Sequence, residues 1–216
     1  LISVGDDWQS IYAFAGSRLD LFNKFSELFL NSKDDMCLST TYRYGQELVN
    51  ITSQFILEND EQSKKQIKST KKLQHPIEFC EYKPYEEDAE IYKVVRKLYE
   101  EHPNDRILIL ARTNECLRQL RKSRFFSKGI NDVLICNDIP GARIEVLTMH
   151  RSKGLTADQV IVFGLRDKVF PSKGRSAHWI FEYFKLDSIT EKMPFAEERR
   201  LFYVALTRTR NKVYLV

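Results

Sequence analysis

Two apolar runs, Ile107-Leu108-Ile109-Leu110-Ala111 and Val160-Ile161-Val162-Phe163, decide the fold class of this chain. Neither run alternates with polar residues, which is typical of strands covered on both faces in a parallel sheet. Similar short runs recur along the chain and predict further strands. The complete set of predicted strands is Leu1–Val4, Met36–Leu38, Ile77–Tyr82, Arg106–Ala111, Val133–Cys136, Ile144–Thr148, Gln159–Phe163 and Val213–Val216.

Helical patterns lie between these strands. Gln46–Leu57, Tyr85–Glu101 and Ala196–Arg208 each place apolar residues three or four positions apart. The alternation of strand and helix predicts an α/β fold with a mainly parallel sheet and flanking helices. Two stretches depart from it: the Lys-rich Glu58–His75 is predicted to be an exposed linker or frayed helix, and Pro171–Pro194 a long surface excursion.

The composition narrows the class of protein. Of 216 residues, 43% are hydrophobic and 30% are charged, which excludes general disorder. The chain has no apolar run of the roughly 18 residues that a membrane crossing needs, and its first residues lack a secretory-signal pattern. We therefore expect a cytoplasmic protein with no membrane partner. The net charge of +4 permits a polyanionic partner without implying one.

The cysteines and histidines do not favour a metal centre. Cys37, Cys80, Cys116 and Cys136 form no C-x-x-C pair, and the four histidines are scattered. Zinc binding and a disulfide framework are both disfavoured by this spacing, and a reducing compartment is favoured. We predict no metal site within this chain.

Polar segments follow three of the predicted strands, where ligands bind in open α/β sheets. They are 5–12, 39–43 and 149–154, and they carry Gln, Arg, Lys and small residues that suit a phosphate. Taken alone, each has an ordinary explanation as a turn, a capped helix or a surface pair. Asp6-Asp7 alone is likewise weak evidence for a metal site.

Four motifs in one order change this assessment, because together they resemble the UvrD/Rep-like superfamily 1 DNA helicases. GDDWQSIYAFAGS at 5–17 resembles motif III, LSTTYR at 38–43 motif IV, VLTMHRSKGL at 146–155 motif V, and EERRLFYVALTR at 197–208 motif VI. The residues of the segment 5–17 are most similar to those of the helicase IV branch. The resemblance implies a RecA-like fold of the P-loop NTPase type. In it, residues 1–33 would end the first motor domain and residues 34–216 would form the second (2A), with a 2B insertion missing or minimal.

For the nucleotide, the resemblance implies that Gln9 senses the γ-phosphate and its attacking water, and that Tyr42 stacks on adenine. Arg43 and Arg208 would reach the γ-phosphate from the second domain as catalytic groups, and Gly154 would lie where motif V approaches the nucleotide. Phosphoryl transfer spreads negative charge over the γ-oxygens, and arginines supplied across a cleft stabilise that charge. The implied cofactors are ATP and Mg²⁺, the metal held mainly by the first motor domain.

For DNA, the resemblance implies that Phe14 stacks on bases, with Tyr12 beside it. Thr148 and His150 match motif V contacts to the DNA backbone, and Lys153 is assigned to the same DNA-binding set. The implied partners are single-stranded DNA, duplex junctions and the first motor domain of the same protein.

The sequence also departs from the family pattern. Ala13 and Ala15 stand where relatives often have arginine, and Thr156 stands where motif V commonly has glutamate. The chain contains no G-x-x-x-x-G-K-[ST] P-loop and no D-E-x-Q motif. The resemblance therefore implies the C-terminal part of an ATP-dependent 3′-to-5′ DNA helicase or translocase of repair or recombination, inactive as an ATPase by itself. A helicase-like ATPase that remodels RNA polymerase or another nucleoprotein complex is the alternative, and a free-standing binding module is a third hypothesis.

Overall fold

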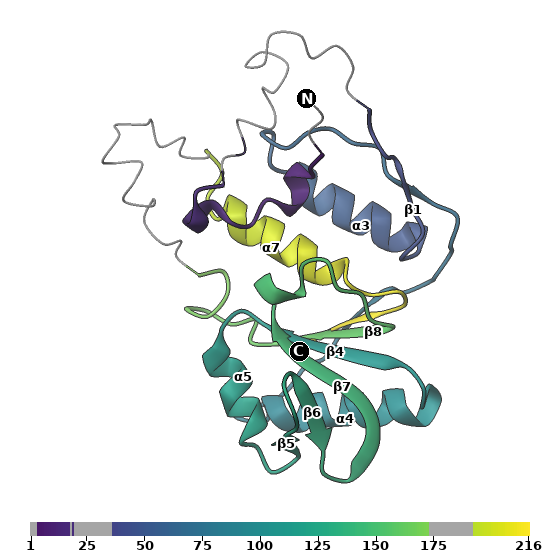
Figure 1. Ribbon diagram of the computed structural model, residues 1–216, viewed down its shortest axis with the longest axis vertical. Coiled ribbons are helices and arrows are strands. Elements are labelled where there is room, and N and C mark those ends of the chain that lie inside the picture. The colour runs from purple at the N-terminus through teal and green to yellow at the C-terminus, as the bar shows by residue number, and fades with distance from the viewer. Residues whose placement is uncertain (1–3, 18, 20–35, 173–191) are drawn as a thin grey trace.

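The computed structural model describes residues 4–17, 19, 36–172 and 192–216 (Figure 1). Within these ranges, seven strands form one sheet in the order β3-β9-β8-β4-β7-β6-β5. Their bounds are β3 Ile77–Phe79, β4 Arg106–Ala111, β5 Phe126–Lys128, β6 Val133–Cys136, β7 Ile139–Thr148, β8 Gln159–Val162 and β9 Val213–Leu215.

The sheet is parallel from β3 to β7 and antiparallel beyond it. β4 pairs with β7 through Ile107↔Ile144 and with β8 through Ile107↔Gln159, both in parallel register. β6 runs antiparallel to both β7 and β5, so a hairpin extends one edge of the parallel sheet. The predicted α/β fold with a mainly parallel sheet is therefore confirmed.

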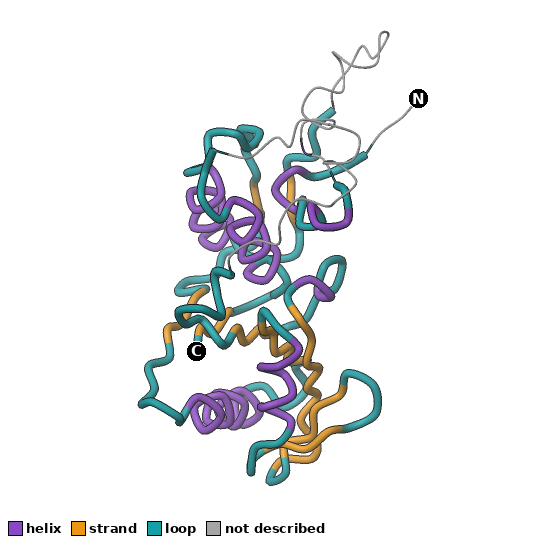
Figure 2. Tube along the Cα trace, turned by 90° about the vertical axis from the view of Figure 1, so that its left-hand side faces the viewer, coloured by secondary structure: helices purple, strands orange, loops and turns teal. Residues whose placement is uncertain are grey.

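Two pairs of helices cover the two faces of the sheet. α4 (Glu87–Glu101) and α5 (Asn114–Arg121) lie on one face, and α3 (Gln46–Leu57) and α7 (Ala196–Leu206) on the other. Figures 1 and 2 show the strands lying between these helix pairs.

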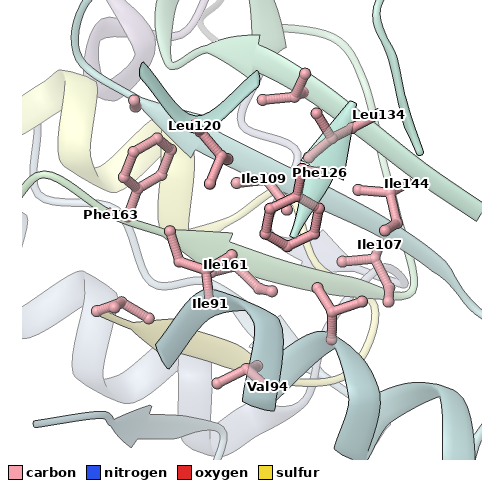
Figure 3. Packing of buried hydrophobic residues seen from close by; sticks show 14 of the residues in the cluster. Ile91, Val94, Ile107, Ile109, Leu120, Phe126, Leu134, Ile144, Ile161 and Phe163 are labelled. Carbon is pink, nitrogen blue, oxygen red and sulfur yellow. The ribbon is translucent and has the colours of Figure 1, made fainter. Parts of the chain in front are cut away.

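Successive side chains of β4 point to opposite faces of the sheet, so this strand contributes to the core on both sides. Ile107 and Ile109 join the cluster under α4 and α5, whereas Leu108 and Leu110 join the cluster under α3 and α7. Figure 3 shows the first cluster, in which Ile91 and Val94 of α4 approach strand residues of the sheet. This double burial explains why β4 reads as a continuous apolar run.

One strand prediction was wrong. Met36–Leu38 is not a strand; β1 (Thr40–Thr41) begins two residues later and pairs in parallel with β2 (Lys68–Ser69). Met36 and Leu38 are almost fully exposed, because the small β1–β2 sheet lies apart from the large one and offers them nothing to pack on.

The sequence also left elements out. Glu58–His75, predicted to be an exposed linker or frayed helix, contains β2 and the buried Asn59 and Gln62. α5 and β5 were not predicted, since each is shorter than a helical or strand pattern needs to be distinctive, and β7 starts five residues before the predicted Ile144. Most of Leu1–Val4 and of Pro171–Pro194 lies outside the described residues.

None of the helices in the described ranges combines the length and the apolar character that crossing a bilayer requires.

Candidate functional site

The predicted nucleotide residues meet at the C-terminal end of α7. The N-terminal segment that carries Gln9 lies along this helix in Figure 1, and Arg200 of α7 donates from Nε to the carbonyl oxygen of Ser10 at 2.6 Å. Arg208 Nη2 lies 3.5 Å from Gln9 Oε1. Arg43 Nη1 donates to the carbonyl oxygen of Thr207 at 3.0 Å. Three residues far apart in sequence therefore lie in one place.

Arg208 is held inside the protein rather than at its surface. Its exposed fraction is 1%, and its Nε donates to the Val204 carbonyl at 2.8 Å. Burial, together with repulsion from Arg43, lowers the pKa of Arg208 from 12.5 to about 10. The guanidinium is still charged at neutral pH, so the site holds two cations that an anion such as phosphate would stabilise.

Two buried tyrosines line the same place. Tyr44 follows Arg43, and Tyr203 lies on α7; burial is the main cause that raises the pKa of each phenol. Both remain neutral at physiological pH. They restrict water around Arg208, which strengthens electrostatic interactions at the site.

Asp6 and Asp7 are not arranged as a metal pair. Lys65 Nζ lies 2.7 Å from Asp6 Oδ1 and also contacts Asp7 Oδ1, so one ammonium bridges both carboxylates. Asp6 Oδ2 accepts from Gln9 Nε2 at 2.5 Å. Among the described residues, no group of three or more His, Cys, Asp or Glu side chains is placed to hold a metal ion.

The predicted DNA residues of motifs III and V lie side by side. The Tyr12 hydroxyl donates to the His150 carbonyl at 3.3 Å, and their ring centroids are 6.3 Å apart. Lys153 Nζ lies 5.1 Å from the Tyr12 ring centroid and donates to the Gln9 carbonyl at 2.9 Å. Lys153 thus joins the DNA residues to the nucleotide residues.

The remaining predicted residues occupy varied environments. Tyr42 is 82% exposed, which leaves its ring open for stacking. Gly154 has a φ of +86° in open space, a conformation that favours glycine. Thr148 is nearly buried at the end of β7, where its hydroxyl accepts from the Arg151 amide at 3.3 Å. The backbone of Phe14 lies in the short helix Ala13–Ala15, and its side chain is outside the described set.

Sequence reasoning missed three residues that hold this site together. Lys65 bridges the two aspartates, Arg200 fixes the Ser10 carbonyl, and Glu197 Oε1 accepts from the Ala13 amide at 2.9 Å. Arg200 and Glu197 lie within motif VI, so the motif itself was a signal for them. Lys65 lies in the polar stretch Glu58–His75, where no sequence motif pointed to it.

Comparisons with known proteins find helicases that are similar in sequence to this chain. Residues 131–216 match the UvrD-like helicase C-terminal domain. DNA helicase IV of Escherichia coli (strain K12) is 34% identical over 220 residues, which cover 99% of this chain and 29% of that protein. The chain is thus similar to part of a DNA helicase over nearly its whole length, and to the UvrD-like helicase C-terminal domain over residues 131–216. A probable DNA helicase of Mycoplasma pneumoniae is 26% identical over 222 residues, which cover 100% of this chain and 38% of that protein.

The fold is also similar to that of a solved structure. A solved structure, the C-terminal domain of a possible DNA helicase from Lactobacillus plantarum WCFS1, superposes with a TM-score of 0.50 at 16% identity. The match covers 82% of this chain and 86% of that one, and it shows the fold alone. Because the chain spans only 29% and 38% of the two curated relatives, their activities as whole proteins reach it only as a proposal.

Proposed function

We propose that this chain is the C-terminal motor region of an ATP-dependent DNA helicase that moves 3′ to 5′ along single-stranded DNA in repair or recombination. Residues 1–33 would complete the first RecA-like domain, and residues 34–216 would form the second. The single observation that carries the proposal is the meeting of Gln9, Arg43 and Arg208 at one end of α7, with Arg208 buried and charged.

The residues present fit the γ-phosphate end of ATP. Arg208 and Arg43 form a partly desolvated cationic pair, and they would stabilise the charge that develops on the γ-oxygens. Gln9 can accept from Arg208 while its amide N–H₂ group orients toward Asp6, a geometry suited to positioning an attacking water. Tyr42, exposed on the same motif as Arg43, would stack on adenine.

Mg²⁺ does not fit the adjacent carboxylates of the described site. The two adjacent carboxylates, Asp6 and Asp7, are already bridged by Lys65, so a divalent cation there would face an ammonium group. The phosphate cradle and the metal would therefore come from the first motor domain, and we expect no ATP hydrolysis from this chain alone.

Single-stranded DNA would cross the surface formed by motifs III and V. Tyr12, together with Phe14, would stack on bases, a contact worth roughly 1–3 kcal/mol per base for any sequence. Lys153 and His150 would contact the phosphate backbone, with Thr148 beneath them. Lys153 also donates to the Gln9 carbonyl. A DNA phosphate that binds Lys153 would compete with this hydrogen bond and would thereby affect the nucleotide site.

The deciding experiment measures ATP turnover by the full-length protein, with and without single-stranded DNA, beside this chain alone. We expect DNA-stimulated turnover from the former and none from the latter. Turnover by the chain alone would contradict the split site. A strand-displacement assay then separates a helicase from an ATPase that only remodels nucleoprotein complexes.

A further inference from the structure

Lys65 occupies an unusual position for a lysine in a polar connecting segment. Its side chain is only 19% exposed, and its ammonium group contacts a carboxylate oxygen of both Asp6 and Asp7. It also lies 5.3 Å from the ring centroid of Trp8, a residue with no exposed surface. A lysine gives up hydration and side-chain freedom to lie here, which requires a compensating interaction.

The backbone around Lys65 is fixed to the same N-terminal segment. The Ser63 amide donates to Asp7 Oδ2 at 2.8 Å, and Trp8 Nε1 donates to the Ser63 carbonyl at 2.9 Å. These reciprocal bonds set the distance from residue 63 to the aspartates. Burial alone would lower the pKa of Lys65, but its hydrogen bonds to Asp6 and Asp7 outweigh burial and raise it. The ammonium is therefore charged at every physiological pH.

The aspartate that Lys65 holds is the one that orients Gln9. Asp6 Oδ2 accepts from Gln9 Nε2, which turns Gln9 Oε1 toward Arg208 Nη2. The order of groups is chemically required, because a carboxylate accepts from the amide N–H₂ and a guanidinium donates to the amide oxygen. Lys65, Asp6, Gln9 and Arg208 thus form one series of hydrogen-bonded contacts.

Without Lys65, Asp6 and Asp7 would lose the ammonium group that pairs with both of them. Asp6 is close enough to Arg208 for its charge to act on the pKa of that arginine. An Asp6 carboxylate released from Lys65 would attract the buried Arg208 and would displace the Gln9 amide between them. An arginine engaged by a carboxylate is less available to a phosphate.

We propose that Lys65 is a positioning residue for the nucleotide site: it neutralises Asp6 and thereby keeps Gln9 aligned and Arg208 available. The inference rests on the proposed ATP-hydrolysing function of the full-length protein. The inference assigns a role in positioning the nucleotide site to the stretch between α3 and β2, which the sequence pattern predicted to be a linker or frayed helix.

The first test compares Lys65→Met, Lys65→Arg and Lys64→Met in the full-length protein. Lys64 is the exposed neighbour and provides the matched loss of charge. We expect Lys65→Met to lower kcat for DNA-stimulated ATP turnover about tenfold, as small misplacements of catalytic groups do, while the affinity for single-stranded DNA is unchanged. Lys65→Arg should retain most of the turnover, and Lys64→Met should match the wild type. Wild-type kcat in a folded Lys65→Met protein would overturn the assignment.

A double-mutant cycle separates positioning from general stability. In an Asp6→Asn background, Lys65→Met should cause little further loss of kcat, because the carboxylate that Lys65 neutralises is gone. Asp6→Asn in the Lys65→Met background should restore part of the turnover, since the asparagine does not compete for Arg208. Equal losses from Lys65→Met in the wild-type and Asp6→Asn backgrounds would show that Lys65 acts elsewhere.

A spectroscopic measurement distinguishes failure of this inference from failure of the proposed function. The side-chain amide resonances of Gln9, followed in the full-length protein, should shift in Lys65→Met and not in Lys64→Met. Unshifted resonances would overturn the positioning role whatever the turnover. Absence of DNA-stimulated turnover in the wild type, with the shift present, would instead count against the proposed function alone.

Discussion

The two faces of the sheet differ in what they bury. Under α4 and α5 the cluster consists of apolar residues and two cysteines, whereas the α3–α7 side of the described structure also encloses Glu198, Arg200 and Arg208. Glu198 is paired with Arg112 at 2.7 Å, whereas Arg208 donates to neutral oxygens: two carbonyls, the Thr207 hydroxyl and Gln9 Oε1. Buried charge is costly to maintain, which fits the proposal that this face binds ligands. We call it the binding face, and the face under α4 and α5 the supporting face.

The strongest test of this difference is Arg208→Ala in the full-length protein. An arginine that stabilises the γ-phosphate charge contributes about 10³-fold or more to turnover, so we expect ATP hydrolysis to be lost while single-stranded DNA binding is largely kept. Arg210→Ala, which removes an arginine that is about half exposed and pairs with Asp158, is the control. Normal turnover in Arg208→Ala would remove the catalytic assignment.

The supporting face is tested by Leu134→Ala. Leu134 has no exposed surface and packs in the cluster shown in Figure 3, where truncation of a leucine costs about 2–5 kcal/mol of unfolding free energy. Its neighbour Val133 points outward, so Val133→Ala should cost less than about 1 kcal/mol. Chemical denaturation measures both. Similar losses in the two variants would mean that β6 is not part of the supporting core.

The DNA-binding side of the binding face is tested by Tyr12→Ala. We expect single-stranded DNA affinity to fall by roughly 1–3 kcal/mol, the value of one stacking contact. Tyr85→Ala is the matched control, because Tyr85 is fully exposed and precedes α4 on the supporting face. Fluorescence anisotropy with a labelled oligonucleotide reads both variants, and equal affinities would count against stacking by Tyr12.

Thiol chemistry gives the smallest expected effect. Burial, with nearby Glu78 and Glu90, raises the pKa of Cys80 on the supporting face to about 11. At pH 8 the thiol is protonated, so alkylation of Cys80 should be slow and should speed up roughly tenfold per pH unit until the pH approaches that pKa. The exposed Cys37 provides the reference site. Peptide mapping by mass spectrometry separates them, and rapid labelling of Cys80 at pH 8 would mean that this edge of the core is open.

The prediction of the fold succeeded where the local pattern was long and failed where it was short. β4 and β8 are buried on both faces, so their apolar runs identified them without any knowledge of their neighbours. α5 has only eight residues, three of them charged, too few for a helical period to stand out. Met36–Leu38 has strand composition, yet the strand forms at Thr40–Thr41, where the partner Lys68–Ser69 is available.

The residues of the candidate site also fall into two groups, those that the sequence identified and those that it did not. The residues within motifs III to VI, such as Gln9 and Arg208, were named from the sequence because motif order and wording carry that information. Lys65 could not be named, since it meets Asp6 across 59 positions of sequence and lies in a stretch with no motif.

The sequence by itself therefore determined the fold class, the order of the motifs and the resemblance to UvrD-like helicases, because periodicity and motif residues are local properties of the chain. Only the tertiary structure decided that Arg208 is buried beside Gln9, that Lys153 bonds the Gln9 carbonyl, and that Lys65 neutralises Asp6. These pairings depend on how distant segments pack against α7. Electrostatic interactions act over a few ångströms in space, irrespective of separation along the chain.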